Sequence, residues 1–275
     1  MSDRFPLDID RLFRVQPGKK ANLDKREADD SSMFPDRDET TKQMAEDAEA
    51  IGLLQDRLYA ENRRAVLIVL QGTDTSGKDG TIRHVMGALG PLGVTVTAFK
   101  QPSELELAHD FLWRVHIACP HRGMVGIFNR SHYEDVLVGR VRKLAPAEEI
   151  EQRYDQINAF EKLLAETGTT ILKFMLHISK DEQRERLQDR LDDPKKRWKF
   201  QPGDLEDRKM WADYQDAYEI MLTRCSTDWA PWYVIPADRK WARNAAIAHI
   251  LRTTLEDMDP KPATPSWDPK QFKVT

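Results

Sequence analysis

The chain alternates between short apolar runs and longer stretches in which apolar residues recur every three or four positions. The short runs predict strands over residues 65–70, 94–99, 124–128, 169–178 and 232–235. The helical spacing predicts helices over 41–63, 81–89, 103–115, 146–167, 179–191, 204–227 and 239–258. Strands that alternate with helices indicate an α/β fold, in which a parallel sheet is flanked by helices on both faces.

The alternation of apolar runs and helical spacing is absent near both ends of the chain. We therefore predict a single domain over residues 41–258. Residues 1–40 are polar and interrupted by prolines, and we predict an extended N-terminal arm there. Residues 259–275 contain four prolines, and we predict an extended C-terminal tail. Within the domain, the strongly charged helical stretch over about 180–212 is an insertion that we expect to act as a lid.

Composition narrows the class of partner. Of the 275 residues, 40% are hydrophobic and 32% are charged, and the net charge is −4. A polyanionic ligand must therefore be held by local lysines and arginines, and nucleic-acid binding is disfavoured. Cys119 and Cys225 have no metal or redox spacing, so we expect reduced thiols in the cytoplasm. No secretory leader is recognised, and no apolar stretch approaches the ~18 residues of a membrane span.

A glycine-rich stretch over residues 71–80 lies between a predicted strand and a predicted helix. Gly72, four further residues and then Gly77-Lys78 have the spacing of a Walker A phosphate loop. Asp79 replaces the usual Ser or Thr after the lysine, and Asp74 adds a second carboxylate, so we expect magnesium to mediate phosphate binding. An ordinary glycine turn is the alternative. Besides Lys78, the predicted phosphate contacts are Gly72, Gly77, Asp79, Gly80 and Thr81.

A dense polar group, residues 129–135, follows the predicted strand at 124–128. In a parallel sheet, the carboxyl end of this strand lies at the same edge as the phosphate loop. Arg130 has the right chemistry to neutralise a transferring phosphoryl group, and Glu134 or Asp135 to hold magnesium or orient an acceptor. Asn129 occupies the place of the usual Walker B aspartate. The alternative is a polar turn with a helix cap, and His132 is expected to pack or to hydrogen-bond.

A basic segment at residues 195–199 follows Arg184, Arg186 and Arg190 along the chain. These side chains predict a lid that grips phosphate groups and excludes water from the reaction. A solvated basic loop, balanced by Asp192, Asp193 and Asp204, is the alternative. We expect Trp198 to anchor the loop.

These features together predict a phosphotransferase with a P-loop. The guanine motif of GTPases, Asn-Lys-x-Asp, is absent from the sequence, and so is the acidic pair of motor ATPases. A kinase acting on a small molecule or a nucleotide remains. Two rivals stay open: an ATP-dependent nucleoside monophosphate kinase, and a regulatory protein that binds polyphosphate without turnover.

Three motifs in order resemble the polyphosphate kinase 2 family. They are Gly72-x-Asp-x-x-Gly-Lys-x-Gly-x-Ile82, Phe128-Asn-Arg-Ser-His-Tyr-Glu-Asp135 and Lys196-Arg-Trp-Lys199. The resemblance covers residues 10–255 and implies a thymidylate-kinase-like P-loop fold. It implies magnesium-dependent, reversible phosphoryl transfer from inorganic polyphosphate to an adenine or guanine nucleotide, by a homo-oligomer. The roles it implies are magnesium binding by Asp74, phosphoryl contacts by Lys78 and Arg130, and lid contacts by Arg190, Arg197 and Lys199.

One motif departs from that of many family members, which have Phe-Asp-Arg-Ser-Trp-Tyr-Asn-Arg. Asn129 and Glu134 make this chain resemble the subgroup that accepts both AMP and ADP. We interpret the exchange as a relocated negative charge, which would relocate a magnesium ion held by Asp74 and Glu134. The donor would lie in a basic channel leading to Lys78. The candidates for that channel are Arg83 and Lys100, followed by Arg114 and Lys143.

Overall fold

The computed structural model describes residues 9–264 and 266–274, and over them the chain forms a five-stranded sheet in which every pairing is parallel. The strands are β1 (Ala65–Gln71), β2 (Val94–Ala98), β3 (Val125–Asn129), β4 (Thr169–His177) and β5 (Trp232–Pro236). Their order in the sheet is β2-β3-β1-β4-β5. All five predicted strands are confirmed, as is the α/β fold class.

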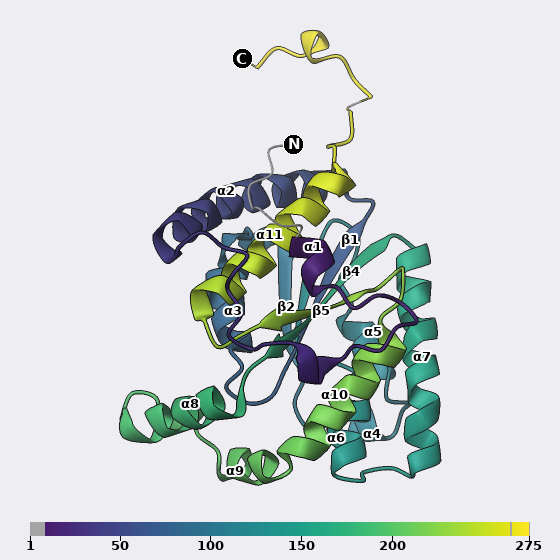
Figure 1. Ribbon diagram of the computed structural model, residues 1–275. Coiled ribbons are helices and arrows are strands. Elements are labelled where there is room, and N and C mark those ends of the chain that lie inside the picture. The colour runs from purple at the N-terminus through teal and green to yellow at the C-terminus, as the bar shows by residue number, and fades with distance from the viewer. Residues whose placement is uncertain (1–8, 265, 275) are drawn as a thin grey trace.

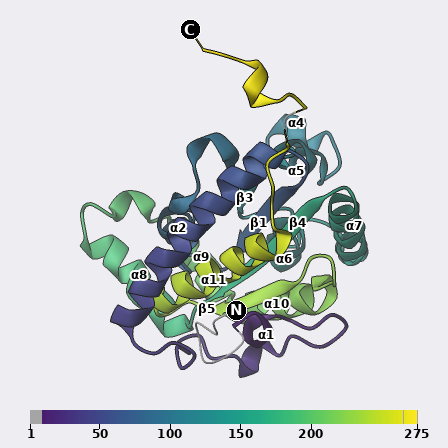
Figure 2. The same cartoon turned by 90° about the horizontal axis from the view of Figure 1, so that it is seen from above.

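Helices cover both faces of the sheet (Figures 1 and 2). One face packs against α1 (Ile9–Phe13), α2 (Arg37–Glu61), α3 (Lys78–His84) and α11 (Lys240–Met258). The other packs against α5 (Trp113–Ala118), α6 (Glu134–Val141), α7 (Ala147–Glu166) and α10 (Trp211–Cys225). Side chains of the fully buried central strand β1 alternate between the two cores. This burial on both faces explains the uninterrupted apolar run of β1.

Three predicted helices differ in the structure. The capping box of Ser103 and Glu106 is confirmed, but it opens only α4 (Glu104–Leu107). The chain then turns at Asp110, whose side chain accepts a hydrogen bond from Leu112 N at 3.0 Å, and α5 begins anew. The helix predicted over 204–227 is two helices, α9 (Pro202–Lys209) and α10, and the one over 81–89 is α3 and a 3-10 turn. Helix α6 was not predicted.

The N-terminal arm is more than an extended segment. Its described part contains α1 and a 3-10 helix (Leu23–Lys25), and Ile9 and Phe13 are buried in the core. Arg14 pairs antiparallel with Tyr233, so the arm covers the outer edge of β5. Helix α2 begins at Arg37, because Asp36 caps it by accepting from Glu39 N at 2.8 Å.

The remaining elements are α8 (Lys180–Asp192), which precedes the basic segment, and a 3-10 helix at Arg197–Lys199 within that segment. The described residues of the tail run away from the body of the protein (Figure 1). Both cysteines are free. Among the described residues, no helix is both long and apolar enough to cross a membrane.

Candidate active site

The glycine-rich stretch forms a tight loop between β1 and α3. Gly72, Thr75 and Gly77 have positive φ angles of 150°, 65° and 108°. A Cβ on Gly77 would lie 1.7 Å from Arg243 Nη1, so this position requires glycine. Four hydroxyls of the loop and of α3 are buried without a hydrogen-bond partner: those of Thr73, Thr75, Ser76 and Thr81. Unpartnered polar groups are rare in protein interiors, and Thr73 and Thr75 line the two cavities described below, where a phosphate oxygen would find their hydroxyls.

Lys78 lies inside this loop and is buried. Its Nζ donates to the backbone oxygens of Gly72 at 2.6 Å and Thr73 at 3.2 Å. Burial and the nearby Arg130 lower the pKa of Lys78 to about 8, although Asp74, Glu134 and Asp79 oppose the shift. The ammonium is therefore a cation that an incoming anion would stabilise strongly.

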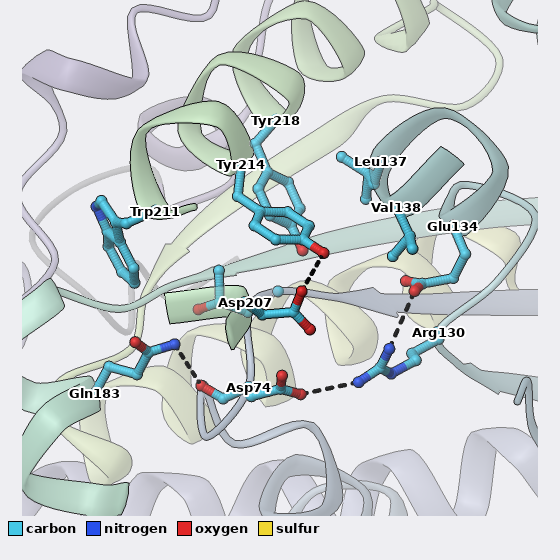
Figure 3. Close-up of a pocket in the computed structure, with 12 residues that line it drawn as sticks. Asp74, Arg130, Glu134, Leu137, Val138, Gln183, Asp207, Trp211, Tyr214 and Tyr218 are labelled. Atoms are coloured by element: carbon cyan, nitrogen blue, oxygen red, sulfur yellow. Dashed lines mark hydrogen bonds and ion pairs between the residues drawn. The ribbon is translucent and has the colours of Figure 1, made fainter. Parts of the chain in front are cut away.

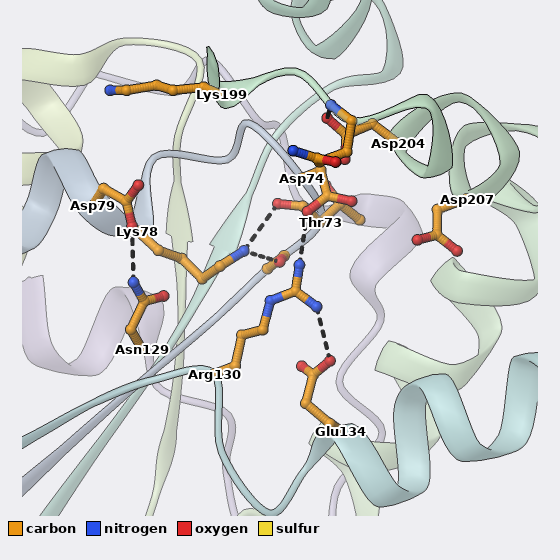
Figure 4. A network of polar contacts seen from close by, with 12 residues as sticks. Thr73, Asp74, Lys78, Asp79, Asn129, Arg130, Glu134, Lys199, Asp204 and Asp207 are labelled. Atoms are coloured by element: carbon orange, nitrogen blue, oxygen red, sulfur yellow. Dashed lines mark hydrogen bonds and ion pairs between the residues drawn. The ribbon is translucent and has the colours of Figure 1, made fainter. Parts of the chain in front are cut away.

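Arg130 bridges the phosphate loop and α6 (Figure 4). Its guanidinium donates to Asp74 Oδ1 at 2.9 Å and to Glu134 Oε2 at 3.1 Å. Burial alone would lower the pKa of Arg130, but Glu134 and Asp74 outweigh burial and raise it. Its backbone has a φ of 63°, which is uncommon outside glycine and indicates a demanding local geometry. The predicted meeting of the 129–135 group with the phosphate loop is thus found.

Asp79, the unusual residue of the loop, pairs with Asn129. Asn129 Nδ2 donates to Asp79 Oδ1 at 2.8 Å across 50 positions of sequence. The neutral amide at the end of β3 therefore orients a carboxylate that an aspartate at this position would repel. Both residues border the larger of the two cavities described below.

The smaller cavity, here called the aromatic cavity, lies between the phosphate loop, α6 and α10 (Figure 3). It is lined by Gly72, Thr73, Asp74, Arg130, Glu134, Leu137, Val138, Gln183, Asp207, Trp211, Tyr214 and Tyr218. Three aromatic rings stand on one side, where Asp207 accepts from Tyr214 Oη at 2.7 Å, and Asp74 and Glu134 with Arg130 stand on the other. The volume is about 30 Å³, and Tyr214 and Tyr218 are buried, so the cavity would have to widen to admit a planar ring that carries a phosphate.

The larger cavity, here called the basic groove, has a volume of about 900 Å³ and runs over the phosphate loop. Its described lining contains eleven lysines and arginines against three aspartates. The cations are Arg37, Lys78, Arg83, Lys100, Arg130, Arg186, Arg190, Lys196, Lys199, Lys240 and Arg243. A groove with this excess of positive charge, on a protein of net charge −4, favours a polyanion locally.

Two of these arginines hold the loop itself: Arg243 was not predicted as a site residue, and Arg186 was predicted only as part of the lid. Arg243, on α11, donates to Ser76 O at 3.1 Å, and Arg186, on α8, donates to Thr75 O at 2.9 Å. Burial and the nearby Arg186 lower the pKa of Arg243 to about 10. The sequence signal was the polar pair Arg243-Asn244 inside an alanine-rich helix.

The structure brings most of the predicted site residues to these two cavities. Those that line at least one of them are Gly72, Asp74, Gly77, Lys78, Asp79, Gly80, Arg83, Lys100, Asn129, Arg130, Glu134, Arg190 and Lys199. Thr81 is buried beneath the loop. His132 is fully buried and lies 3.2 Å from Glu161, as expected of a packing and hydrogen-bonding residue.

Five predicted residues lie elsewhere, and none of them lines either cavity. Asp135 is turned to Arg153 at 3.4 Å, because one residue along a helix changes the direction by about 100°. Arg197 is exposed and donates to Leu191 O, while Arg114 donates to Lys100 O at 2.9 Å. Lys143 is exposed, and Trp198 is 74% exposed and therefore no anchor.

A magnesium ion fits the donor set of the aromatic cavity. Asp74, Glu134 and Asp207 supply the carboxylate oxygens that Mg²⁺ prefers. Within the described residues, no group of three or more His, Cys, Asp or Glu side chains could hold a metal alone. Mg²⁺ commonly takes one or two carboxylates and completes its shell with water and substrate phosphates, so Asp74 and Glu134, which pair with Arg130 here, would be its candidate ligands once a phosphate is present.

Comparisons with known proteins agree on one family. The family described as polyphosphate kinase 2 matches residues 35–263. The chain is 53% identical over 264 residues to an AMP/ADP-polyphosphate phosphotransferase of Meiothermus ruber, covering 93% of this chain and 97% of that protein. It is 40% identical to an ADP-polyphosphate phosphotransferase of Rhodopseudomonas palustris, covering 96% and 94%. The crystal structure of polyphosphate kinase 2 from Arthrobacter aurescens TC1 superimposes with a TM-score of 0.93 at 41% identity, covering 97% and 95%.

Proposed function

The chain belongs to the polyphosphate kinase 2 family, and on that premise we propose that it transfers the terminal phosphoryl group of inorganic polyphosphate to ADP and to AMP. One observation carries the proposal. Asp74 and Arg130 line both the basic groove and the aromatic cavity, so the two cavities meet at these side chains. A donor in one and an acceptor in the other would bring their phosphates together there.

The basic groove suits the donor. Polyphosphate is a flexible chain with a negative charge on every phosphate, and the groove offers cations along its length instead of a single pocket. Lys78 and the inward backbone of the phosphate loop would hold the terminal groups. The unpartnered hydroxyl of Thr75, a residue that lines this groove, supports this position, because a phosphate oxygen would supply its missing partner.

The nucleotide would enter at the aromatic cavity, whose volume of about 30 Å³ would have to increase to admit a purine ring. An outward movement of α10 would open the faces of Trp211, Tyr214 and Tyr218 to the ring, and such stacking tolerates adenine and guanine alike. The acceptor phosphate would then point toward Arg130. The names of the relatives from Meiothermus ruber and Rhodopseudomonas palustris, which mention AMP or ADP, support this choice of acceptor.

Catalysis would rest mainly on positioning and charge, as in other phosphoryl transfers. Lys78 would neutralise the donor, and Arg130 would stabilise charge that develops on the phosphoryl group between donor and acceptor. Asp74 and Glu134 orient Arg130 and would hold magnesium. Magnesium held by Asp74 and Glu134 would supply positive charge that offsets the negative charge of the reacting phosphates.

Asn129 and Glu134 would account for acceptance of both AMP and ADP. Glu134 is the only one of the two that carries charge, and it faces the aromatic cavity, whereas Asn129 faces the basic groove. Of these two positions, the carboxylate therefore lies on the acceptor side, and it would draw magnesium there. On that side AMP and ADP differ by one phosphate. An unchanged ratio of AMP to ADP activity in Glu134→Asn would count against this account.

We further propose that the segment over about 180–212 closes over the donor as a lid. Arg190 and Lys199 of this segment line the basic groove, which supports the idea. The domain division at residues 41–258, a homo-oligomeric state and a cytoplasmic location remain predictions. Size-exclusion chromatography with light scattering would test the oligomer.

The decisive experiment mixes the purified protein with Mg²⁺, long-chain polyphosphate and AMP, and omits ATP. Formation of ADP and then ATP is expected, with none in Lys78→Ala and normal rates in Lys143→Ala, whose exposed lysine lines neither cavity. If ADP is converted but AMP is not, the account of Asn129 and Glu134 is wrong. If product appears only with added ATP, the protein is an ATP-dependent nucleotide kinase. Binding of polyphosphate without any product would indicate a regulatory protein.

A further inference from the structure

A buried polar network lies next to the aromatic cavity, among the side chains of the core that packs against α6, α7 and α10. His132, Tyr133, Glu161 and Lys173 are each fully buried. Lys173 Nζ, on β4, donates to Tyr133 Oη at 2.7 Å, to Glu161 Oε2 at 2.5 Å and to Cys225 O at 2.7 Å. These three acceptors match the three protons of a lysine ammonium, so the cation is fully satisfied.

Glu161, on α7, holds the other side of the network. Its Oε1 accepts from Tyr133 Oη at 2.8 Å and lies 3.2 Å from His132 Nε2. Burial alone would raise the pKa of Glu161, but Lys173 and His132 outweigh burial and lower it. The carboxylate is therefore charged. Because every bond is directional and water is excluded, the network prescribes where His132 and Tyr133 must lie.

The side of the aromatic cavity that Arg130 and Glu134 form is continuous with this network. His132 and Tyr133 lie between Arg130 and Glu134 in sequence, at the turn that opens α6. His132 and Tyr133 enter the network, whereas Arg130 and Glu134 form the 3.1 Å ion pair at the cavity. Tyr133 N also donates to Ser131 Oγ at 3.2 Å, which tightens the turn. A displacement of His132 and Tyr133 would therefore also displace Arg130 and Glu134.

Helix α10, which forms the opposite side of the aromatic cavity, is bonded to Lys173 of the same network. Cys225 is the last residue of α10, the helix whose Tyr214 and Tyr218 line the aromatic cavity. The bond from Lys173 to Cys225 O uses one of the carbonyls that a helix end leaves without an intrahelical partner. The buried ammonium of Lys173 thus joins the turn that carries Tyr133 to the end of α10.

We propose that this network is a positioning device for phosphoryl transfer, with Tyr133 and Lys173 as positioning residues that hold Arg130 opposite α10. The inference rests on the proposed function. A buried ion pair contributes little net stability compared with apolar side chains of the same volume, which favours a role in geometry over one in stability. Displacement of a charged group by ~1 Å can slow an enzyme ~100-fold.

The test removes one hydroxyl. Tyr133→Phe keeps the ring but cuts the bonds to Glu161 and Lys173, and we expect kcat with ADP to fall at least ~10-fold. The KM for polyphosphate should change less than ~2-fold, because the basic groove is untouched. Tyr154→Phe is the matched control, since Tyr154 is also buried on this face but its hydroxyl lies outside the network. A Tyr133→Phe enzyme with the parental kcat would overturn the proposal.

A second variant and a second readout keep the test sharp. The double variant Lys173→Met with Glu161→Gln removes both charges together, so it should stay folded yet lose at least ~10-fold in kcat. A folded double variant with full activity would refute the positioning role. The Nε–H NMR signal of Arg130, assigned with Arg130→Lys, should shift or broaden in Tyr133→Phe and not in Tyr154→Phe. This signal tests the network even if the parent proves inactive with polyphosphate, and an unchanged signal would reject it.

Discussion

Binding of polyphosphate should be accompanied by proton uptake at Lys78. In the free protein, burial and Arg130 lower the pKa of this lysine to about 8, from an ordinary value of 10.5. Phosphates in the loop would surround the ammonium with negative charge and return its pKa to ~10.5 or above. At a pH between these two pKa values, Lys78 is largely neutral in the free protein and charged in the complex.

The magnitude follows from the two pKa values. Their difference corresponds to ~3 kcal/mol that disfavours the ammonium in the free site. At pH 8 about half of the lysines are neutral, so each complex should take up ~0.5 proton, against ~0.1 at pH 7 and ~0.9 at pH 9. Above pH 8, the Kd for polyphosphate should rise ~10-fold per pH unit until pH ~10.

The assay is isothermal titration calorimetry of polyphosphate into the protein, without nucleotide. Measurements at pH 8 in two buffers of different ionisation enthalpy give the number of protons taken up. Lys78→Met should abolish the uptake, whereas Lys100→Met, which removes an exposed lysine of the same groove, should preserve it. The reasoning is refuted if the parent takes up no proton at pH 8, or if Lys78→Met takes up as many as the parent.

The same pKa has a consequence for stability without ligand. Because the folded-state pKa of Lys78 is lowered, the unfolded chain binds more protons between pH 8 and 10.5. The contribution of this lysine to the free energy of unfolding therefore rises with pH across that window. The free energy of unfolding of the parent minus that of Lys78→Met, measured with urea, should therefore increase from pH 8 to pH 10.5.

Three further predictions concern the two cavities. Gly77→Ala should lower kcat/KM at least ~10-fold, because the new Cβ meets Arg243 and φ is 108°, and adding Arg243→Ala should relieve the clash but not the backbone strain. Arg83→Ala should raise the KM for polyphosphate ~3- to 10-fold, whereas Arg114→Ala, outside the groove, should leave it unchanged; equal effects would remove Arg83 from the donor path. Glu134→Asn should lower AMP activity relative to ADP activity at least ~5-fold, measured as the ratio of the two kcat/KM values.

The elements around the site were predictable because their signals are local. Apolar runs predicted strands such as β1, whose residues are buried on both faces, and the alternation of Val and Thr predicted β2. The spacing of Gly72, Gly77 and Lys78 predicted the phosphate loop, because its shape depends on glycines within one short stretch. Helix breaks were predicted less well, as the single helix expected over 103–115 shows. Competing bonds such as that of Asp110 decide these breaks.

The phosphate loop, the polar group after β3 and the reaction class could therefore be inferred from the sequence by itself. The loop and the polar group each depend on residues within about ten positions of one another, where backbone geometry leaves few arrangements, and the reaction class follows from these motifs taken together. Only the tertiary structure decided that Asp135 points to Arg153 instead of the site, and that Arg243 holds the loop across 167 positions of sequence. The network of Tyr133, Glu161 and Lys173 is likewise invisible along the chain. A buried charge is stable only where packing brings its partner, and packing joins residues by space and not by sequence.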